Sequence, residues 1–239
     1  MESFIPTAII IAFVSLVFWV IRSSKKQREA IRQIHFKLGF TEVANPDQAL
    51  LDRITSVARH RNERISVSQV YKRDEGSCVL YDCHIHSSRE KNSGHRSSVL
   101  VVPEAHLPAF RLAPCMAETG MFSGLVRKAT QLAMTQGDFS TVDTASMPDF
   151  SAKYLLTAKE PGRIQAELPS HLWREIMALS DRFFLKARDD TIIFSVFDMA
   201  ARRKGSSPGA EEERLSQAIK VASALGRIFK STARDAVYA

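Results

Sequence analysis

The sequence predicts an α+β fold, in which an N-terminal transmembrane helix precedes a mixed, mainly antiparallel sheet domain that is covered by helices. Three observations predict this class. The chain opens with a long uncharged stretch, the later strands cluster instead of alternating with helices, and the helices each carry one apolar face. A charged fraction of 25% and a hydrophobic fraction of 45% are also typical of a folded globular chain.

The uncharged stretch runs from Phe4 to Ile21 and is followed by Arg22, Lys25, Lys26 and Arg28. Its 18 residues would form a helix roughly 27 Å long, close to the roughly 30 Å hydrocarbon thickness of a bilayer. Basic residues that flank a span stay on the cytoplasmic side. We therefore expect a single-pass cell inner membrane protein with its N-terminus outside and its C-terminal domain cytoplasmic. The competing interpretation is a buried core helix.

Two regions follow from this interpretation. Residues 1–28 form the transmembrane anchor and its basic collar, which contact the lipid bilayer through Phe4 to Ile21, and residues 29–239 form the cytoplasmic α+β domain. A division of that domain into two subdomains near residues 135–150 is left open. The three cysteines, Cys78, Cys83 and Cys115, form an odd set on a reducing side of the membrane, so we expect free thiols.

The first half of the domain contains clear start and stop signals. Asn45-Pro46-Asp47 reads as an N-cap followed by proline in the first turn, and Asp74-Glu75-Gly76 reads as a hairpin turn. The predicted elements are helices over 26–36 and 46–60 and strands over 65–71, 78–86 and 98–102. Residues 107–114 contain prolines and apolar residues without regular spacing, which indicates an extended stretch that packs irregularly.

The second half mixes short helices and strands before a long closing helix. The strand that begins at Thr191 is apolar on both faces, which is typical of a strand in the centre of a sheet. The closing helix repeats apolar residues every three or four positions from Leu215 to Phe229, so it should cover a sheet face. The other predicted elements are a helix over 122–133, a loop or edge strand over 137–149, a strand over 153–157, helices opening at Glu160-Pro161 and at Ser170, and strands over 183–188 and 191–199.

The most specific group of candidate ligand or catalytic residues lies on the predicted strand over 78–86. Its members are Cys78, Asp82, Cys83, His84 and His86. Because strand side chains alternate, Asp82, His84 and His86 project from one face, and thiolate, imidazole and carboxylate are the usual ligands of zinc. This predicts a candidate zinc site that still needs a ligand such as His95 or Cys78. The spacing fits no zinc-finger pattern, and a solvated face explains His84 and His86 equally well.

Other catalytic and nucleic-acid signals are weak. Cys83 follows the carboxylate but points away from His84, because adjacent strand residues face opposite sides, so the neighbouring imidazole does not activate it. The sequence contains no Walker, Rossmann, H-E-x-x-H or kinase motif. The net charge is +7, yet the cations are dispersed and accompany no nucleic-acid fold signature, so nucleic acid is not an expected partner.

The domain resembles a class of bacterial single-pass membrane proteins with a cytoplasmic α+β domain and no assigned activity. The segments that carry the resemblance span about residues 38 to 156 and are Leu38-Gly39-Phe40, Val79-Leu80-Tyr81-Asp82, the stretch from Leu107 to Pro114, and the stretch from Asp149 to Leu156. The resemblance implies an architecture, and it transfers no catalytic residue or cofactor. Cys83, His84 and His86 stand where the class is expected to have aromatic residues.

Together these observations favour a non-catalytic binding or scaffold module with a protein partner. The alternative is a metal-dependent or thiol enzyme centred on the strand from Asp82 to His86. A third interpretation, binding of nucleic acid or lipid by the dispersed cations, requires strongly salt-dependent binding.

Overall fold

The computed structural model describes residues 4–59, 63–88, 95–115, 123–179, 182–196 and 207–235. Their strands form one nine-stranded sheet in the order β1-β2-β3-β4-β9-β8-β5-β7-β6, and every pairing between neighbours is antiparallel. The α+β class is therefore confirmed, and the sheet is wholly antiparallel within this part of the chain. Strands from both sides of residues 135–150 belong to this sheet, and the division into subdomains stays a prediction.

The N-terminal half forms two helices and five strands. They are α1 (Phe4–Lys37), β1 (Thr41–Val43), α2 (Gln48–Ala58), β2 (Ile65–Glu75), β3 (Cys78–Ser87), β4 (His95–Val101) and β5 (Leu107–Pro114). The predicted cap at Asn45 is wrong: Asp47 caps α2, because its carboxylate accepts a hydrogen bond from the Leu50 amide at 2.6 Å. The predicted hairpin is present, with Gly76 at a φ of 65° between β2 and β3.

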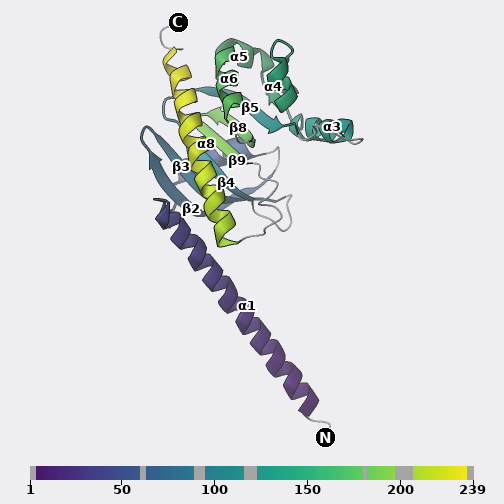
Figure 1. Ribbon diagram of the computed structural model, residues 1–239, viewed down its shortest axis with the longest axis vertical. Helices are drawn as coiled ribbons and strands as arrows, with labels where there is room; N and C mark the ends of the chain where they lie inside the picture. Colours follow the sequence, from purple (N-terminus) through teal and green to yellow (C-terminus); the bar gives the residue numbers. More distant parts are fainter. Residues whose placement is uncertain are drawn as a thin grey trace.

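The C-terminal half forms five helices and four strands in the described residues. They are α3 (Ser123–Met134), β6 (Ser140–Thr141), α4 (Pro148–Lys153), β7 (Tyr154–Ala158), α5 (Pro161–Glu167), α6 (Ser170–Ala178), β8 (Phe183–Asp189), β9 (Thr191–Val196) and α8 (Pro208–Asp235). The strand that is apolar on both faces, β9, does lie in the centre of the sheet, between β4 and β8. Figure 1 shows α8 crossing the sheet and α1 projecting away from it.

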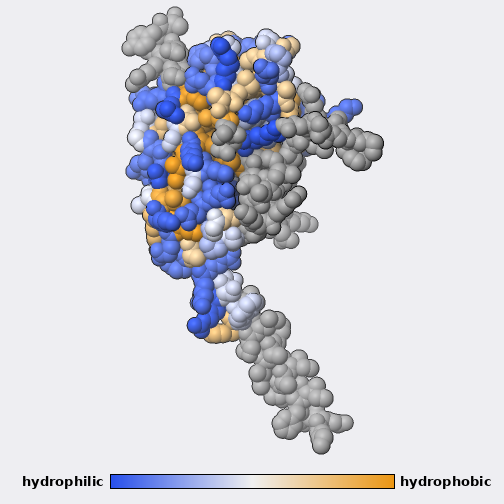
Figure 2. Space-filling view, in the orientation of Figure 1, coloured by the Kyte–Doolittle hydropathy of each residue, from blue (hydrophilic) through white to orange (hydrophobic). Residues whose placement is uncertain are grey.

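The two faces of the sheet are covered differently. On one face, α8, α4, α5, α6 and the end of α1 enclose the larger core, which includes Leu80, Phe110, Phe194 and Phe229. On the other face, α2 packs on a smaller core that contains Ile54, Cys83 and Ile193. In the orientation of Figure 1, hydrophobic residues show in the region of α8 and the neighbouring strands, surrounded by hydrophilic residues (Figure 2).

The stretch from Leu107 to Pro114 differs from the prediction. It is not an irregular extended segment but a strand, β5, paired with β8 on one side and β7 on the other. A register shift between Leu107 and Phe110 breaks its alternation, which is why the sequence shows no regular period. From Phe110 onward the strand alternates normally, with Phe110 and Leu112 in the larger core and Arg111 on the opposite face.

The predicted transmembrane span is contradicted. Within the described part of the chain, no helix combines the length and the apolar composition that a bilayer crossing requires. The stretch Phe4 to Ile21 belongs to the longer helix α1, which includes the charged residues that follow and ends at Lys37, and the side chains of 4–17, 20 and 21 lie outside the description. The predicted single-pass inner membrane location and the predicted orientation were derived from this span, so they are wrong as well.

The close approach of α8 to β3 generates a prediction. A Cβ atom added at Gly226 would lie 3.0 Å from Cys78 Sγ, whereas one added at Gly209 of the same helix would meet nothing within 4 Å. We expect Gly226→Val to lower the free energy of unfolding by about 1–3 kcal/mol, because it forces the helix away from the sheet. Urea unfolding measures this, with Gly209→Val as the matched control. Equal losses in both variants would show that contact with Cys78 is not the cause.

Candidate functional site

A buried carboxylate, Asp82, lies at the junction of α1, α8 and the sheet. It is on β3, on the face that α8 covers, and its side chain is 1% exposed. Its Oδ2 atom is 2.9 Å from His35 Nε2 and 3.3 Å from Arg96 Nε, and its Oδ1 atom accepts a hydrogen bond from Arg214 Nη2 at 2.8 Å. Both carboxylate oxygens are therefore engaged by cationic or ring nitrogens.

His35 is fully buried near the end of α1 and bonds through both ring nitrogens. Nδ1 is 2.9 Å from the Ile31 carbonyl oxygen, and Nε2 is 2.9 Å from Asp82 Oδ2. A carbonyl and an ionised carboxylate only accept hydrogen bonds, so each ring nitrogen lies where it can donate one. The ring also stacks on Tyr71 at a centroid distance of 3.9 Å, which fixes the end of α1 against β2.

Glu211 completes the cluster from the first turn of α8. It accepts a hydrogen bond from Arg96 at 2.5 Å and two from Arg214, at 2.9 and 3.1 Å. The cluster therefore sets His35, Arg96 and Arg214 against two carboxylates. It joins a helix near the start of the chain to one near the end, and the exposed pair Lys37–Glu212 at 2.7 Å repeats that connection at the surface.

The cations hold these carboxylates in the ionised form. Burial alone would raise the pKa of Asp82, but Arg214, the hydrogen bond from His35 and Arg96 together lower it to about 2. Burial would likewise raise the pKa of Glu211, and the hydrogen bond and charge of Arg214 lower it. Conversely, burial would lower the pKa of Arg214, and Asp82 and Glu211 raise it. The guanidinium groups of Arg96 and Arg214 thus balance the charges of the two carboxylates.

The structure separates the residues of the predicted zinc site. Asp82 is buried in the ion cluster, His84 is half-buried, and His86 is exposed with Nε2 3.2 Å from Ser68 Oγ. The two imidazole rings stack with their centroids 6.0 Å apart. Burial, followed by the charge of Arg96, lowers the pKa of His84. The proposed ligand set stays a prediction, and its suggested third ligand His95 has a side chain outside the description.

The structure brings a different trio within ligand distance of one another. The trio is His35, Asp82 and Glu211. Each offers one possible ligand atom, and these three atoms all lie within 4.8 Å of one another. Arg96 and Arg214 already neutralise the two carboxylates, however, and His35 presents a donating N–H where a metal needs a lone pair. This arrangement favours a structural ion cluster over a metal centre.

The cysteines show no sign of activation. Cys83 lies on the α2 face in the smaller core, and burial together with the charge of Asp82 raises its pKa to about 12. Cys78 is buried beneath α8, and Cys115 is partly exposed. All three are free thiols, as the odd count in the sequence predicts.

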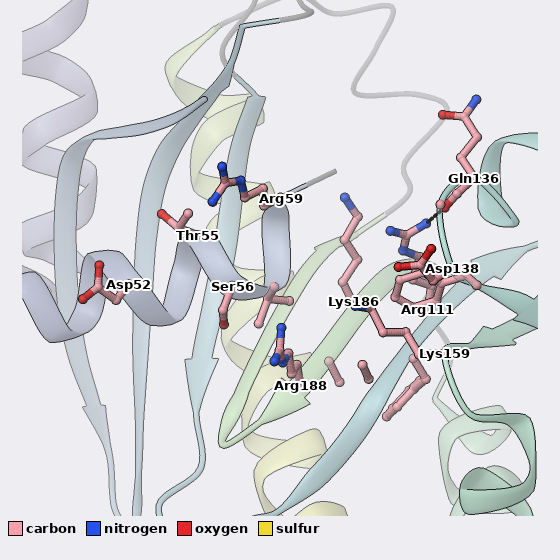
Figure 3. A pocket seen from close by; sticks show the side chains of 16 residues that line it. Asp52, Thr55, Ser56, Arg59, Arg111, Gln136, Asp138, Lys159, Lys186 and Arg188 are labelled. Carbon is pink, nitrogen blue, oxygen red and sulfur yellow. Dashed lines mark hydrogen bonds between the residues drawn. The ribbon is translucent and has the colours of Figure 1, made fainter. Parts of the chain in front are cut away.

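A second site, which the sequence did not indicate, lies where α2 stops covering the sheet. A cleft of about 480 Å³ opens between α2, the strands β5 and β8, and the segment that follows α3. Five of its lining residues are basic, namely Arg59, Arg111, Lys159, Lys186 and Arg188, and two are acidic, Asp52 and Asp138. Figure 3 shows Arg111, Lys159 and Lys186 together on one side of the cleft and Thr55 and Ser56 on the α2 wall.

Arg111 forms the floor of this cleft and is held in a fixed orientation. It is only 4% exposed, and its Nη1 donates to the carbonyls of Met134 and Gln136 at 3.1 and 3.2 Å. Its guanidinium carbon lies 3.6 Å from the centroid of the Phe139 ring. In the described part of the chain its Nε and Nη2 atoms make no hydrogen bond, so donors remain for a ligand.

The neighbouring cations crowd Arg111. Lys186 is its direct cross-strand partner on β8, and Lys159 follows β7 on the same face. Like charges directly opposite one another destabilise a strand pair. Burial lowers the pKa of Arg111 to about 10, and the nearby carboxylate of Glu63 opposes this shift. Even with Glu63 counted, cations outnumber carboxylates around the cleft.

Comparisons of the chain with protein-family models, with curated proteins and with solved structures find no match. The two sites themselves therefore carry the evidence for a function.

Signals for both sites exist in the sequence but are faint. Arg111 interrupts an otherwise apolar stretch, and Lys186 and Arg188 alternate with Leu185 and Ala187, which marks a strand with one basic face. Asp82 likewise stands among apolar residues. The sequence does not show which residues are partners, because strand order and the packing of α1 on the sheet decide which charged side chains come into contact.

Replacing the central carboxylate tests the ion cluster. We expect Asp82→Asn to lower the free energy of unfolding by about 3–5 kcal/mol, because it leaves buried cations without their counter-charge. Asp74→Asn serves as the control, since Asp74 is 72% exposed, and it should change stability by no more than about 0.5 kcal/mol. Urea unfolding gives both values, and an Asp82→Asn variant as stable as the control would contradict the cluster's structural role.

The lowered pKa of Asp82 predicts an acid-dependent contribution to stability. The folded pKa of about 2 lies below the ordinary value of 3.8. The contribution is therefore present in full above about pH 4 and is lost as the pH falls toward 2. It amounts to about 2 kcal/mol. The difference in unfolding free energy between wild type and Asp82→Asn, measured from pH 6 to pH 2, should shrink by about 2 kcal/mol below pH 4. A constant difference across that range would show that Asp82 does not titrate as proposed.

Proposed function

We propose that this protein is a non-catalytic binding module and that it holds an anionic ligand in the cleft between α2 and the sheet. The sequence already favoured a binding module over an enzyme, and the cleft supplies a place for the ligand. The expected protein partner remains a separate prediction.

The observation that carries this proposal is that Nε and Nη2 of the buried Arg111 make no hydrogen bond in the described part of the chain. A buried guanidinium costs free energy unless its charge and hydrogen bonds are satisfied. Two backbone carbonyls and the Phe139 ring satisfy part of Arg111, and its remaining donors face a cleft that other cations line. An anion between Arg111 and Lys159 would complete these interactions and relieve the repulsion among the cations.

The rival interpretation, an enzyme centred on the strand from Asp82 to His86, has less support. Catalysis by Cys83 would need a thiolate near neutral pH, and its pKa is raised to about 12. Asp82 has both oxygens engaged by cluster partners, which leaves it poorly placed as a general base. No other specific observation favours a second function.

Thermal unfolding in the presence of simple anions tests the proposal. The panel is phosphate, sulfate, citrate and succinate, and the proteins are wild type, Arg111→Gln and Lys159→Gln. An anion at 100 times its Kd should stabilise the wild type by about 2.7 kcal/mol. In both variants most of this stabilisation should be lost, because each variant lacks one cation of the cleft.

Arg174→Gln is the matched control. Arg174 is an exposed arginine on α6, which packs on the opposite side of the sheet. Phosphate and sulfate also stabilise folded proteins by exclusion from their surfaces, so the measured quantity is the difference between each cleft variant and this control. If each anion in the panel raises the unfolding temperature of all four proteins equally, the cleft is not an anion site.

A further inference from the structure

We infer that the ligand of the cleft is a small organic phosphate, whose phosphoryl group binds to Arg111, Lys159 and Lys186. This inference rests on the proposed anion-binding function and specifies the chemical class of the anion. It draws on the directions from which the cations approach, the hydrogen-bonding atoms that Arg111 retains, and the size of the cleft.

The cations reach the cleft from three neighbouring positions in the sheet. Arg111 is on β5, in the middle, with Lys186 opposite it on β8 and Lys159 just beyond the end of β7 on the other side. Donors at three neighbouring positions of the sheet can contact a tetrahedral group with three terminal oxygens from different sides. A carboxylate offers two oxygens in one plane, so it would leave part of this donor set unused.

The guanidinium of Arg111 is suited to the same group. Its carbonyl partners and the Phe139 ring fix the plane of the fork, while Nε and Nη2 stay available as parallel donors. A guanidinium fork of this kind binds two phosphate oxygens at once. The excess of basic over acidic lining residues favours a dianion such as a phosphomonoester over a monoanion.

The remainder of the cleft has room for an organic group. Its volume of about 480 Å³ falls in the range of about 300–1,000 Å³ that small-molecule sites occupy. The lining also includes apolar Val57 and Ala187 and the hydroxyls of Thr55 and Ser56. Such a lining contacts both carbon atoms and hydroxyl groups, which predicts a phosphate ester in preference to inorganic phosphate.

Isothermal titration calorimetry with four probes tests this inference: inorganic phosphate, glycerol 1-phosphate, glycerol and succinate. We expect glycerol 1-phosphate to bind the wild type more tightly than inorganic phosphate. Both should bind at least tenfold more tightly than succinate, and glycerol should show no binding. Lys159→Gln and Arg111→Lys should each weaken binding of glycerol 1-phosphate at least tenfold, while Arg174→Lys should leave it unchanged.

The outcomes separate this inference from the function on which it rests. If succinate binds as tightly as the phosphates and Lys159→Gln weakens it, the cleft is an anion site but phosphoryl selectivity is wrong. If inorganic phosphate binds more tightly than its ester, the organic part of the inference is wrong. If no anion binds, the proposed function itself fails. Because Lys159 is exposed, its variant remains informative even if Arg111→Lys does not fold.

Discussion

A sheet of nine antiparallel strands has two broad faces, and the covering of these faces is the constraint on which this structure depends. The long helix α8 and the short helices α4, α5 and α6 bury one face under a continuous apolar core. On the other face, α2 contacts strands from β2 to β8, with its own smaller core. Where α2 ends, the sheet presents basic side chains instead of apolar ones, and the cleft forms there.

The ion cluster around Asp82 has a different role from the cleft. Its charges are matched within the molecule, and it connects α1, the sheet and α8 through hydrogen bonds to both carboxylate oxygens. A buried cluster of this kind specifies one arrangement of its elements more than it adds stability, because the cost of desolvating each charge offsets much of the attraction. The cleft, by contrast, has more basic than acidic lining residues, and Arg111 keeps donors that make no hydrogen bond in the described part of the chain. This difference separates a structural site from a binding site.

The sequence predicted most elements where the signal is local. The turn at Gly76, the central strand β9 and the closing helix α8 all follow from neighbouring residues. The helix α2 was also predicted, but its cap is Asp47 and not the predicted Asn45. The sequence did not predict β5, because the register shift in this strand hides its period. The predicted span from Phe4 to Ile21 was wrong, because this stretch was considered without the rest of the helix α1 to which it belongs. Neither site could be predicted, because His35 is 47 residues from Asp82, and Arg111 meets Lys186 only through strand order.

The most direct test of the account observes the guanidinium of Arg111 itself. Nuclear magnetic resonance of a protein labelled with ¹⁵N in its arginine side chains follows each Nε–H signal during titration with glycerol 1-phosphate. The account predicts that the Arg111 signal shifts and saturates while that of Arg174 does not move. An unchanged Arg111 signal, or equal drifts of all arginine signals, would contradict the assignment of the cleft as the binding site.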